Sequence, residues 1–134
     1  MQIMKIKRLK SDLVGGYSFW CPACSERHVY YTESYDDKQR PLWGFNNNHE
    51  SPTFTPSLNM TSVRHKTMTD EDWIEYDKLV AQQGERAPLN DPRFRHVCHL
   101  FITDGKIIYC GDCMHEYAGK TIDLPDIPEH TEKN

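Results

Sequence analysis

Residues 17–32 read Tyr17-Ser-Phe-Trp20-Cys21-Pro-Ala-Cys24-Ser-Glu-Arg-His28-Val-Tyr-Tyr-Thr32, two aromatic and β-branched runs on either side of a Cys-Pro-Ala-Cys turn. Such runs favour β-strands, so the segment predicts a hairpin with this turn at its tip. A Cys-x-x-Cys turn folds both sulfurs toward one point about 2.3 Å away, which is the geometry of a zinc knuckle. The sequence therefore predicts a metal ion at the tip, with Cys21 and Cys24 as two of its ligands.

The composition gives such an ion a structural role. The chain has 134 residues and a formal charge of -4, which fits one compact domain. Leu, Ile, Val and Phe together make up less than a fifth of the chain, so the core is thin and would gain from a metal staple. Side chains that bind metals are plentiful, with 5 Cys and 7 His.

The cysteines and the N-terminal residues also indicate a compartment. An odd number of cysteines favours thiolate ligands or free thiols over a disulfide framework. The N-terminal residues lack the apolar run of a signal peptide, and no segment approaches the roughly 20 apolar residues that span a bilayer. We expect a soluble, cytoplasmic protein that does not contact a membrane.

A second region rich in Cys and His lies between His96 and His115. Asp104-Gly105 predicts a two-residue turn between two strands, which places His99 opposite Cys110. On this register Cys98 lies on one face of the hairpin together with Cys113 and His115, and His99 lies on the other face with Cys110. A bulge near Gly111 would bring His99 to the first face instead, so the register alone leaves its position open.

Zinc takes four ligands from thiolates and imidazoles, and Zn²⁺ fits this donor set best. The pattern leaves open which four of six candidates bind it: Cys21, Cys24, Cys98, His99, Cys113 and His115. Cys110 is expected to be a small buried side chain rather than a ligand. Of the other histidines, we expect three at the solvated surface (His49, His65 and His130), whereas His28 and His96 stay undecided.

The remaining segments predict a mainly β fold of the α+β class, a small antiparallel β domain with one inserted helix. Thr69 as an N-cap, an acidic first turn and Gly84 at the end predict a helix over 69–83, within an insert of about 62–95. We expect one zinc-stapled β-rich domain over 1–124, followed by a polar C-terminal tail at 125–134.

The segment between Pro52 and Ser57 is expected to be extended, because Pro52 and Pro56 bracket it. Proline has no N–H to give to a neighbouring strand, so this segment is not expected to form a central strand. Trp43 and this segment are interpreted as an aromatic core anchor and a rigid connection, or alternatively as a partner-binding groove.

Several motifs together resemble a family of small bacteriophage and prophage proteins that are often labelled ammonia monooxygenase. The motifs that carry the resemblance are Cys21-Pro-Ala-Cys24, Trp43-Gly-Phe-Asn46, Pro52-Thr-Phe-Thr-Pro-Ser57, Cys98-His-Leu-Phe-Ile-Thr-Asp-Gly105 and Asp112-Cys-Met-His115 with Ala118-Gly119. The resemblance covers most of the chain outside 62–95. It implies that the six candidate ligands are motif positions, that Cys110 is not one, and that the protein works in a bacterial host cell.

Two functions compete on these grounds. The first is a phage accessory protein with a structural zinc that binds a macromolecular partner, a protein, as a host-interaction or anti-defence factor. The alternative is a zinc-dependent hydrolase of a peptide, amide or nucleotide bond, with Glu26, Asp112 or Glu116 as general base. A Cys nucleophile paired with His99 or His115 is a third option.

Two further functions fit the sequence poorly. Monooxygenase chemistry would need two histidines and a carboxylate on iron, or a membrane-embedded copper site, and the chain offers neither pattern. The net negative charge argues against nucleic-acid binding, which requires a broad basic surface.

Overall fold

The structure is a computed structural model that describes residues 4–128. Within these residues the chain forms eight strands in two antiparallel sheets and one α-helix. The mainly β class that the sequence predicts is therefore confirmed. The strands are β1 (Ile6–Lys10), β2 (Val14–Cys21), β3 (Glu26–Ser34), β4 (Gly44–Phe45), β5 (Phe54–Val63), β6 (Arg95–Thr103), β7 (Lys106–Tyr109) and β8 (Thr121–Asp123).

The first sheet has the order β1-β2-β3 and contains the predicted Cys-Pro-Ala-Cys hairpin. Cys21 is the last residue of β2 and pairs with Glu26, the first residue of β3, so the turn lies at the tip as expected. The buried side chains of the hairpin, including Phe19 and Tyr30, point toward the second sheet. Aromatic residues thus supply much of the volume that the scarce aliphatic residues do not.

The second sheet has the order β4-β5-β6-β7-β8. Asp104 and Gly105 both adopt positive φ (49° and 76°), as the predicted two-residue turn requires, and Leu100 pairs with Tyr109 on the predicted register. The expectation for the proline-rich segment is wrong in part. Phe54–Val63 is a ten-residue strand inside the sheet, and Pro56 is accommodated because the pairing with β6 is interrupted between Phe54 and Leu58.

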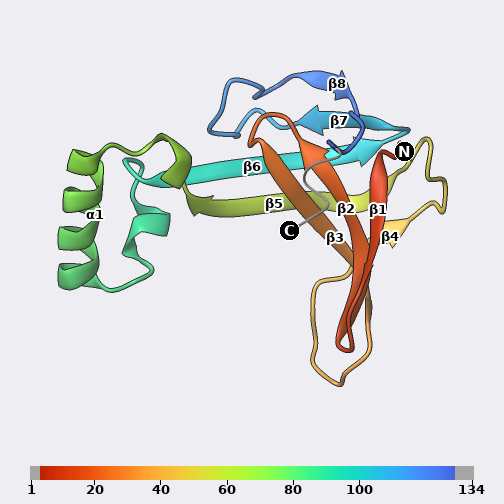
Figure 1. Ribbon diagram of the computed structural model, residues 1–134, viewed down its shortest axis with the longest axis horizontal. Coiled ribbons are helices and arrows are strands. Elements are labelled where there is room, and N and C mark those ends of the chain that lie inside the picture. The colour runs from red at the N-terminus through yellow and green to blue at the C-terminus, as the bar shows by residue number, and fades with distance from the viewer. Residues whose placement is uncertain (1–3, 129–134) are drawn as a thin grey trace.

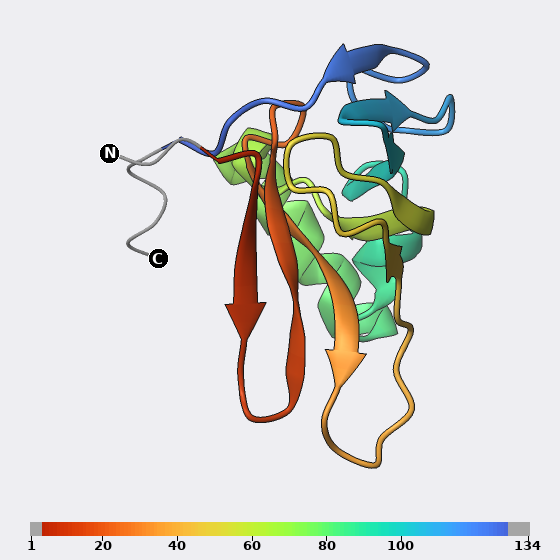
Figure 2. The same cartoon turned by 90° about the vertical axis from the view of Figure 1, so that its right-hand side faces the viewer.

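The core lies between the two sheets. Figures 1 and 2 show β1–β3 packed across one face of β5–β7. The rings of Tyr30 from β3 and Phe54 from β5 stack with their centroids 4.3 Å apart. Leu100 and Ile102 of β6 are fully buried in the same cluster. The opposite face of the second sheet is more open, since Phe101 and Ile108 are 39% and 37% exposed there.

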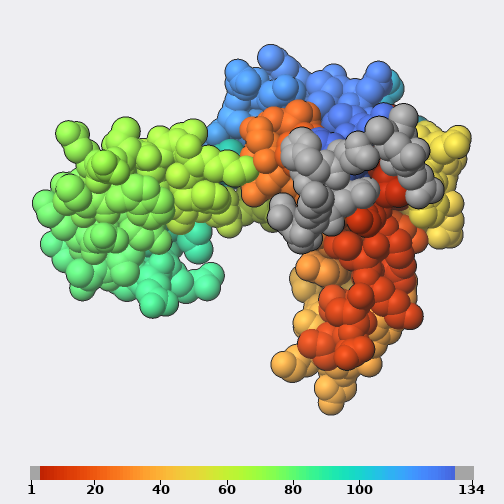
Figure 3. Space-filling model, viewed as in Figure 1, coloured from red at the N-terminus to blue at the C-terminus, as the bar shows by residue number. Residues whose placement is uncertain are grey.

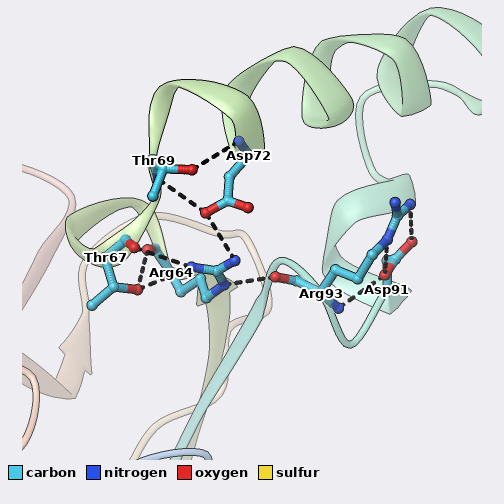
Figure 4. A network of polar contacts seen from close by, with 6 residues as sticks. All are labelled: Arg64, Thr67, Thr69, Asp72, Asp91 and Arg93. Carbon is cyan, nitrogen blue, oxygen red and sulfur yellow. Dashed lines mark hydrogen bonds and ion pairs between the residues drawn. The ribbon is translucent and has the colours of Figure 1, made fainter.

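The helix α1 (Asp70–Gln83) belongs to an arm that β5 and β6 carry to one side, together with the short 3₁₀ turns at His65–Thr67 and Ala87–Asn90 (Figure 1). Thr69 is the N-cap, as predicted: its side chain accepts a hydrogen bond from the Asp72 N–H, and the Asp72 side chain accepts one from the Thr69 N–H. Arg64 connects this cap to the segment before β6 by pairing with Asp72 and donating to the Arg93 carbonyl (Figure 4).

After β8 the chain crosses back to the first sheet. Ile127 is buried and its N–H donates to the Met4 carbonyl. Of the tail predicted at 125–134, residues 129–134 lie outside the described part of the chain. None of the helices within residues 4–128 is long and apolar enough to cross a membrane.

Candidate functional site

The tip of the β2–β3 hairpin meets β6 at a buried cluster of three cysteines and one histidine. Cys21, Cys24, His28 and Cys98 each offer a ligand atom, and these atoms all lie within 4.8 Å of one another. The Cys21 and Cys98 sulfurs are 4.0 Å apart, close to the roughly 3.8 Å edge of a tetrahedron whose Zn–S bonds are about 2.3 Å long. Hairpin packing therefore joins two segments that are 77 residues apart.

The electrostatics of this cluster favour a bound cation. Hydrogen bonds from the Cys24 and Cys98 thiols lower the pKa of Cys21, so a thiolate forms readily at that sulfur. The same interaction with Cys21 raises the pKa of Cys24 to about 12 and also raises the pKa of Cys98. The three sulfurs thus hold one negative charge easily and further charges only when a cation neutralises them.

The residues of the cluster fit zinc. Three thiols and one imidazole form a Cys₃His set, which is a common closed tetrahedral site. Nε2 of His28 is buried and has no hydrogen-bond partner within residues 4–128, and buried polar atoms of this kind normally have one. A metal ion in this cluster would give Nε2 of His28 the partner that it lacks.

The structure brings three of the six predicted ligands into this cluster: Cys21, Cys24 and Cys98. His115 lies nearby with His96, their ring centroids 5.8 Å apart, and His96 Nε2 is 3.2 Å from the Cys24 sulfur. Cys113 lies apart from the cluster, because β7 ends at Tyr109 and the strand alternation assumed for Cys113 and His115 stops there. The Cys113 thiol instead donates to the backbone carbonyl of His99.

His99 belongs to a different group on the opposite face of β6. Its Nδ1 lies 3.1 Å from a carboxylate oxygen of Asp112, and its Nε2 lies 3.0 Å from the hydroxyl oxygen of Ser57. A carboxylate only accepts hydrogen bonds, so Nδ1 carries the proton and the Nε2 lone pair faces the Ser57 hydroxyl. This arrangement of nucleophile, base and orienting acid is that of a Ser-His-Asp triad.

The local structure of β5 presents Ser57 at this point. Three residues of β5 lie between Phe54 and Leu58, whereas only Phe101 lies between their partners on β6. The strand therefore bulges where Ser57 emerges. The Trp43 indole N–H donates to the Ser57 carbonyl over 3.1 Å, and the Trp43 backbone N–H donates to Tyr31 of the first sheet. Trp43 thus connects β5 at Ser57 to β3 of the first sheet.

Neither cysteine near His99 competes well as the nucleophile. Cys110 offers its sulfur within 4.8 Å of ligand atoms of His99 and Asp112. Burial, followed by the Asp112 charge, raises the pKa of Cys110, and burial likewise raises the pKa of Cys113. Reactive cysteines have a lowered pKa, so these two thiols are suited to packing rather than to attack.

Two residues of these groups were missed or undecided from the sequence. The sequence indicates only a rigid connection or a partner-binding groove around Ser57, although this residue ends a motif that accompanies His99 and Asp112. The sequence leaves His28 undecided. Hairpin packing, rather than spacing, brings His28 to Cys98.

Comparison with known proteins gives one family. A model of the bacterial ubiquitination-like system serine protease (BubE) family matches residues 2–110, which include Ser57 and His99 and end two residues before Asp112. No curated protein and no solved structure matches the chain. The matched family gives no support to the bacteriophage or ammonia monooxygenase labels that the sequence resemblance carried. Since the match covers most of the chain, this protein belongs to the BubE family of bacterial ubiquitination-like system serine proteases.

Proposed function

We propose that this protein is a serine protease in which Ser57 is the nucleophile, His99 the general base and Asp112 the residue that orients His99. The main support for this assignment is the hydrogen-bonded chain from Asp112 through both ring nitrogens of His99 to Ser57. The family to which the chain belongs is described as a serine protease family, which supports this assignment.

The geometry is suited to acyl transfer. The Ser57 hydroxyl oxygen attacks the carbonyl carbon of the scissile bond while His99 Nε2 takes the hydroxyl proton. The imidazolium then gives this proton to the nitrogen of the leaving amine, and the acyl group stays on Ser57 as an ester. Water, deprotonated by the same nitrogen, hydrolyses the ester and returns the proton to Ser57.

Asp112 holds the Nδ1 proton of His99 and stabilises the imidazolium that forms in each step. Its side chain is 60% exposed, whereas that of His99 is 24% exposed. Water screens the charge of an exposed carboxylate, so the electrostatic contribution of Asp112 is smaller than that of a buried triad acid. Its main role here is to orient the ring.

The cluster of three cysteines and His28 has a structural role in this proposal. A zinc ion held by Cys21, Cys24, His28 and Cys98 would be closed by four protein ligands and would supply folding free energy. Cys98 and His99 are neighbours on β6 whose side chains point to opposite faces. A staple on Cys98 therefore fixes the strand that carries His99, and the chemistry takes place on the other face of the sheet.

This assignment keeps part of the hydrolase alternative from the sequence and changes its mechanism. Hydrolysis of a peptide bond remains, but Asp112 orients a histidine instead of activating a metal-bound water. The macromolecular partner expected from the sequence becomes a polypeptide substrate. The matched family is described as one of serine proteases of a bacterial ubiquitination-like system, which supports a polypeptide substrate.

Diisopropyl fluorophosphate tests the triad without knowledge of the substrate, because it esterifies only an activated serine. We expect one label per chain, located on Ser57 by mass spectrometry of peptides. Ser57→Ala and His99→Gln should abolish labelling, whereas Ser62→Ala, on the same strand, should not alter it. Labelling that persists in Ser57→Ala, or no labelling of the folded wild-type protein, would contradict the proposal.

A further inference from the structure

Two backbone hydrogen bonds show which residues of β5 direct their N–H and C=O groups toward β6. The Arg64 N–H donates to the Phe94 carbonyl, and the Cys110 N–H donates to the His99 carbonyl. Met60 pairs with Cys98 in the register of β5 against β6, so the even-numbered residues of β5 direct their N–H and C=O groups to β6. The odd-numbered residues of β5 therefore direct theirs to the opposite edge.

That opposite edge is paired at one end only. Thr53 and Thr55 face the β4 segment, and the carbonyl of Ser57 is bound by the Trp43 indole. Beyond Ser57 the next outward residues are Asn59 and Thr61, and no strand within residues 4–128 pairs with them on this side. Their two N–H and two C=O groups form a free edge that begins two residues after the nucleophile.

This edge lacks the features that usually protect a free strand. Exposed edges are normally guarded by charged side chains, prolines or a covering segment. Asn59, Met60, Thr61 and Ser62 are all uncharged, and the side chains of Asn59 and Thr61 are exposed. Figures 1 and 3 show a notch beneath this part of β5, between the arm that carries α1 and the arm formed by β1–β3.

We propose that the Asn59–Thr61 edge binds the polypeptide substrate as an added β-strand and leads its scissile bond to Ser57. The inference rests on the proposed protease function, since it names how the substrate of that site is held. Alternating unpaired N–H and C=O groups specify the occupant, because only another extended backbone satisfies them in turn. The edge ends before Val63, because the Val63 carbonyl accepts a hydrogen bond from His65 Nδ1. From Ser57 to Thr61 it is about 13 Å long, enough for roughly four substrate residues.

Backbone recognition has a consequence for specificity. Main-chain hydrogen bonds are the same for every residue except proline, so this edge selects an extended, flexible segment rather than a particular side chain. A folded protein would be cut only where a tail or linker reaches the notch. Side-chain preference, if present, would come from the exposed Phe101 next to His99, whose ring centroid lies 6.3 Å from that of the histidine.

Proline substitution tests the edge directly. Thr61→Pro removes an outward N–H and adds a ring that blocks an incoming strand, while an outward position on an edge tolerates proline in the fold. Thr61→Ala is the matched control, because it removes the side chain and keeps the N–H. Asn59→Pro and Asn59→Ala form a second, independent pair. Circular dichroism checks that each variant is folded.

The probe is a mixture of random-sequence 14-residue synthetic peptides, with cleavage read by mass spectrometry. We expect both proline variants to cleave it at least about tenfold more slowly than wild type and both alanine variants to stay within about twofold. The rate of Ser57 labelling by diisopropyl fluorophosphate should be unchanged in all four, because that small reagent does not need the edge.

The outcomes separate this inference from the proposed function. Two results would contradict substrate binding at this edge: proline variants that cleave the peptides as fast as wild type, or alanine variants whose cleavage rate falls as much as that of the proline variants. Labelling of wild-type Ser57 without any cleavage of the peptide mixture would also overturn it and leave the triad standing. Absence of labelling would instead reject the triad.

Discussion

Replacement of Cys98 by serine is expected to unfold the protein, because it removes one of the four proposed zinc ligands. Cys98 is 1% exposed and Cys21 is fully buried, so water cannot take the place of either sulfur as a ligand. Structural zinc sites contribute about 10–16 kcal/mol of apparent binding free energy, whereas a domain of this size has a net stability of about 5–15 kcal/mol. Loss of the ion therefore removes a free energy as large as the whole stability of the fold.

The assay combines metal analysis with unfolding. Wild-type protein should contain one zinc per chain by mass spectrometry, and its cobalt form should show the strong visible absorption of tetrahedral thiolate coordination. A chelator, or Cys98→Ser, should abolish the cooperative thermal transition seen by circular dichroism. Cys110→Ser is the matched control, since Cys110 lies outside the cluster and should lower the melting temperature only slightly. Metal-free protein that melts at the same temperature as untreated protein would refute the staple.

Four further predictions concern the triad and the helix arm. Asp112→Asn should slow labelling of Ser57 by about tenfold to a hundredfold, because His99 loses the acceptor that fixes its tautomer; an unchanged rate would exclude Asp112 from the site. Trp43→Phe should slow labelling by about threefold to tenfold without unfolding the chain, since it removes the hydrogen bond to the Ser57 carbonyl and keeps a ring in the core. Thr69→Ala should lower the free energy of unfolding by about 1 kcal/mol, measured by urea denaturation, and leave Ser57 labelling unaffected. A backbone hydrogen bond from Thr69 lowers the pKa of Asp72 below its ordinary 3.8. The contribution of Asp72 to helix capping should therefore be complete above pH 3.8 and should disappear as the pH falls through the lowered pKa. Acid should then reduce the helical ellipticity of the wild type but not that of Asp72→Asn.

Local chemistry was enough to predict the elements whose signals lie within a few residues. Thr69 begins the helix because its hydroxyl oxygen accepts a hydrogen bond from a backbone N–H of the first turn, and Gly84 ends it because a residue without a Cβ tolerates the positive φ of 99° there. Asp104-Gly105 sets the turn and hence the register of β6 and β7, because both residues adopt positive φ there. The Cys-Pro-Ala-Cys turn likewise forms at the hairpin tip.

The role of the proline-rich segment did not follow from its own residues. Pro56 argues against a paired strand, yet the bulge between Phe54 and Leu58 lets β5 continue past it. That outcome depends on β6 and on the Trp43 indole, which lies 14 residues earlier in the chain. The same bulge presents Ser57, so the paired strand and the position of the proposed nucleophile have one cause, which is the packing of this segment against β6 and Trp43.

Residue types and their spacing along the chain are enough for the mainly β class, the helix with its caps, the two hairpin turns and the surplus of Cys and His around them. Those features depend on backbone preferences and on side chains a few residues apart. Only the tertiary structure divided the surplus into two groups, with Cys98 joining Cys21, Cys24 and His28 in the core and its neighbour His99 joining Ser57 and Asp112 on the outer face. The physical reason is that successive side chains of β6 point to opposite faces of the sheet, and packing of the two sheets decides what each face meets.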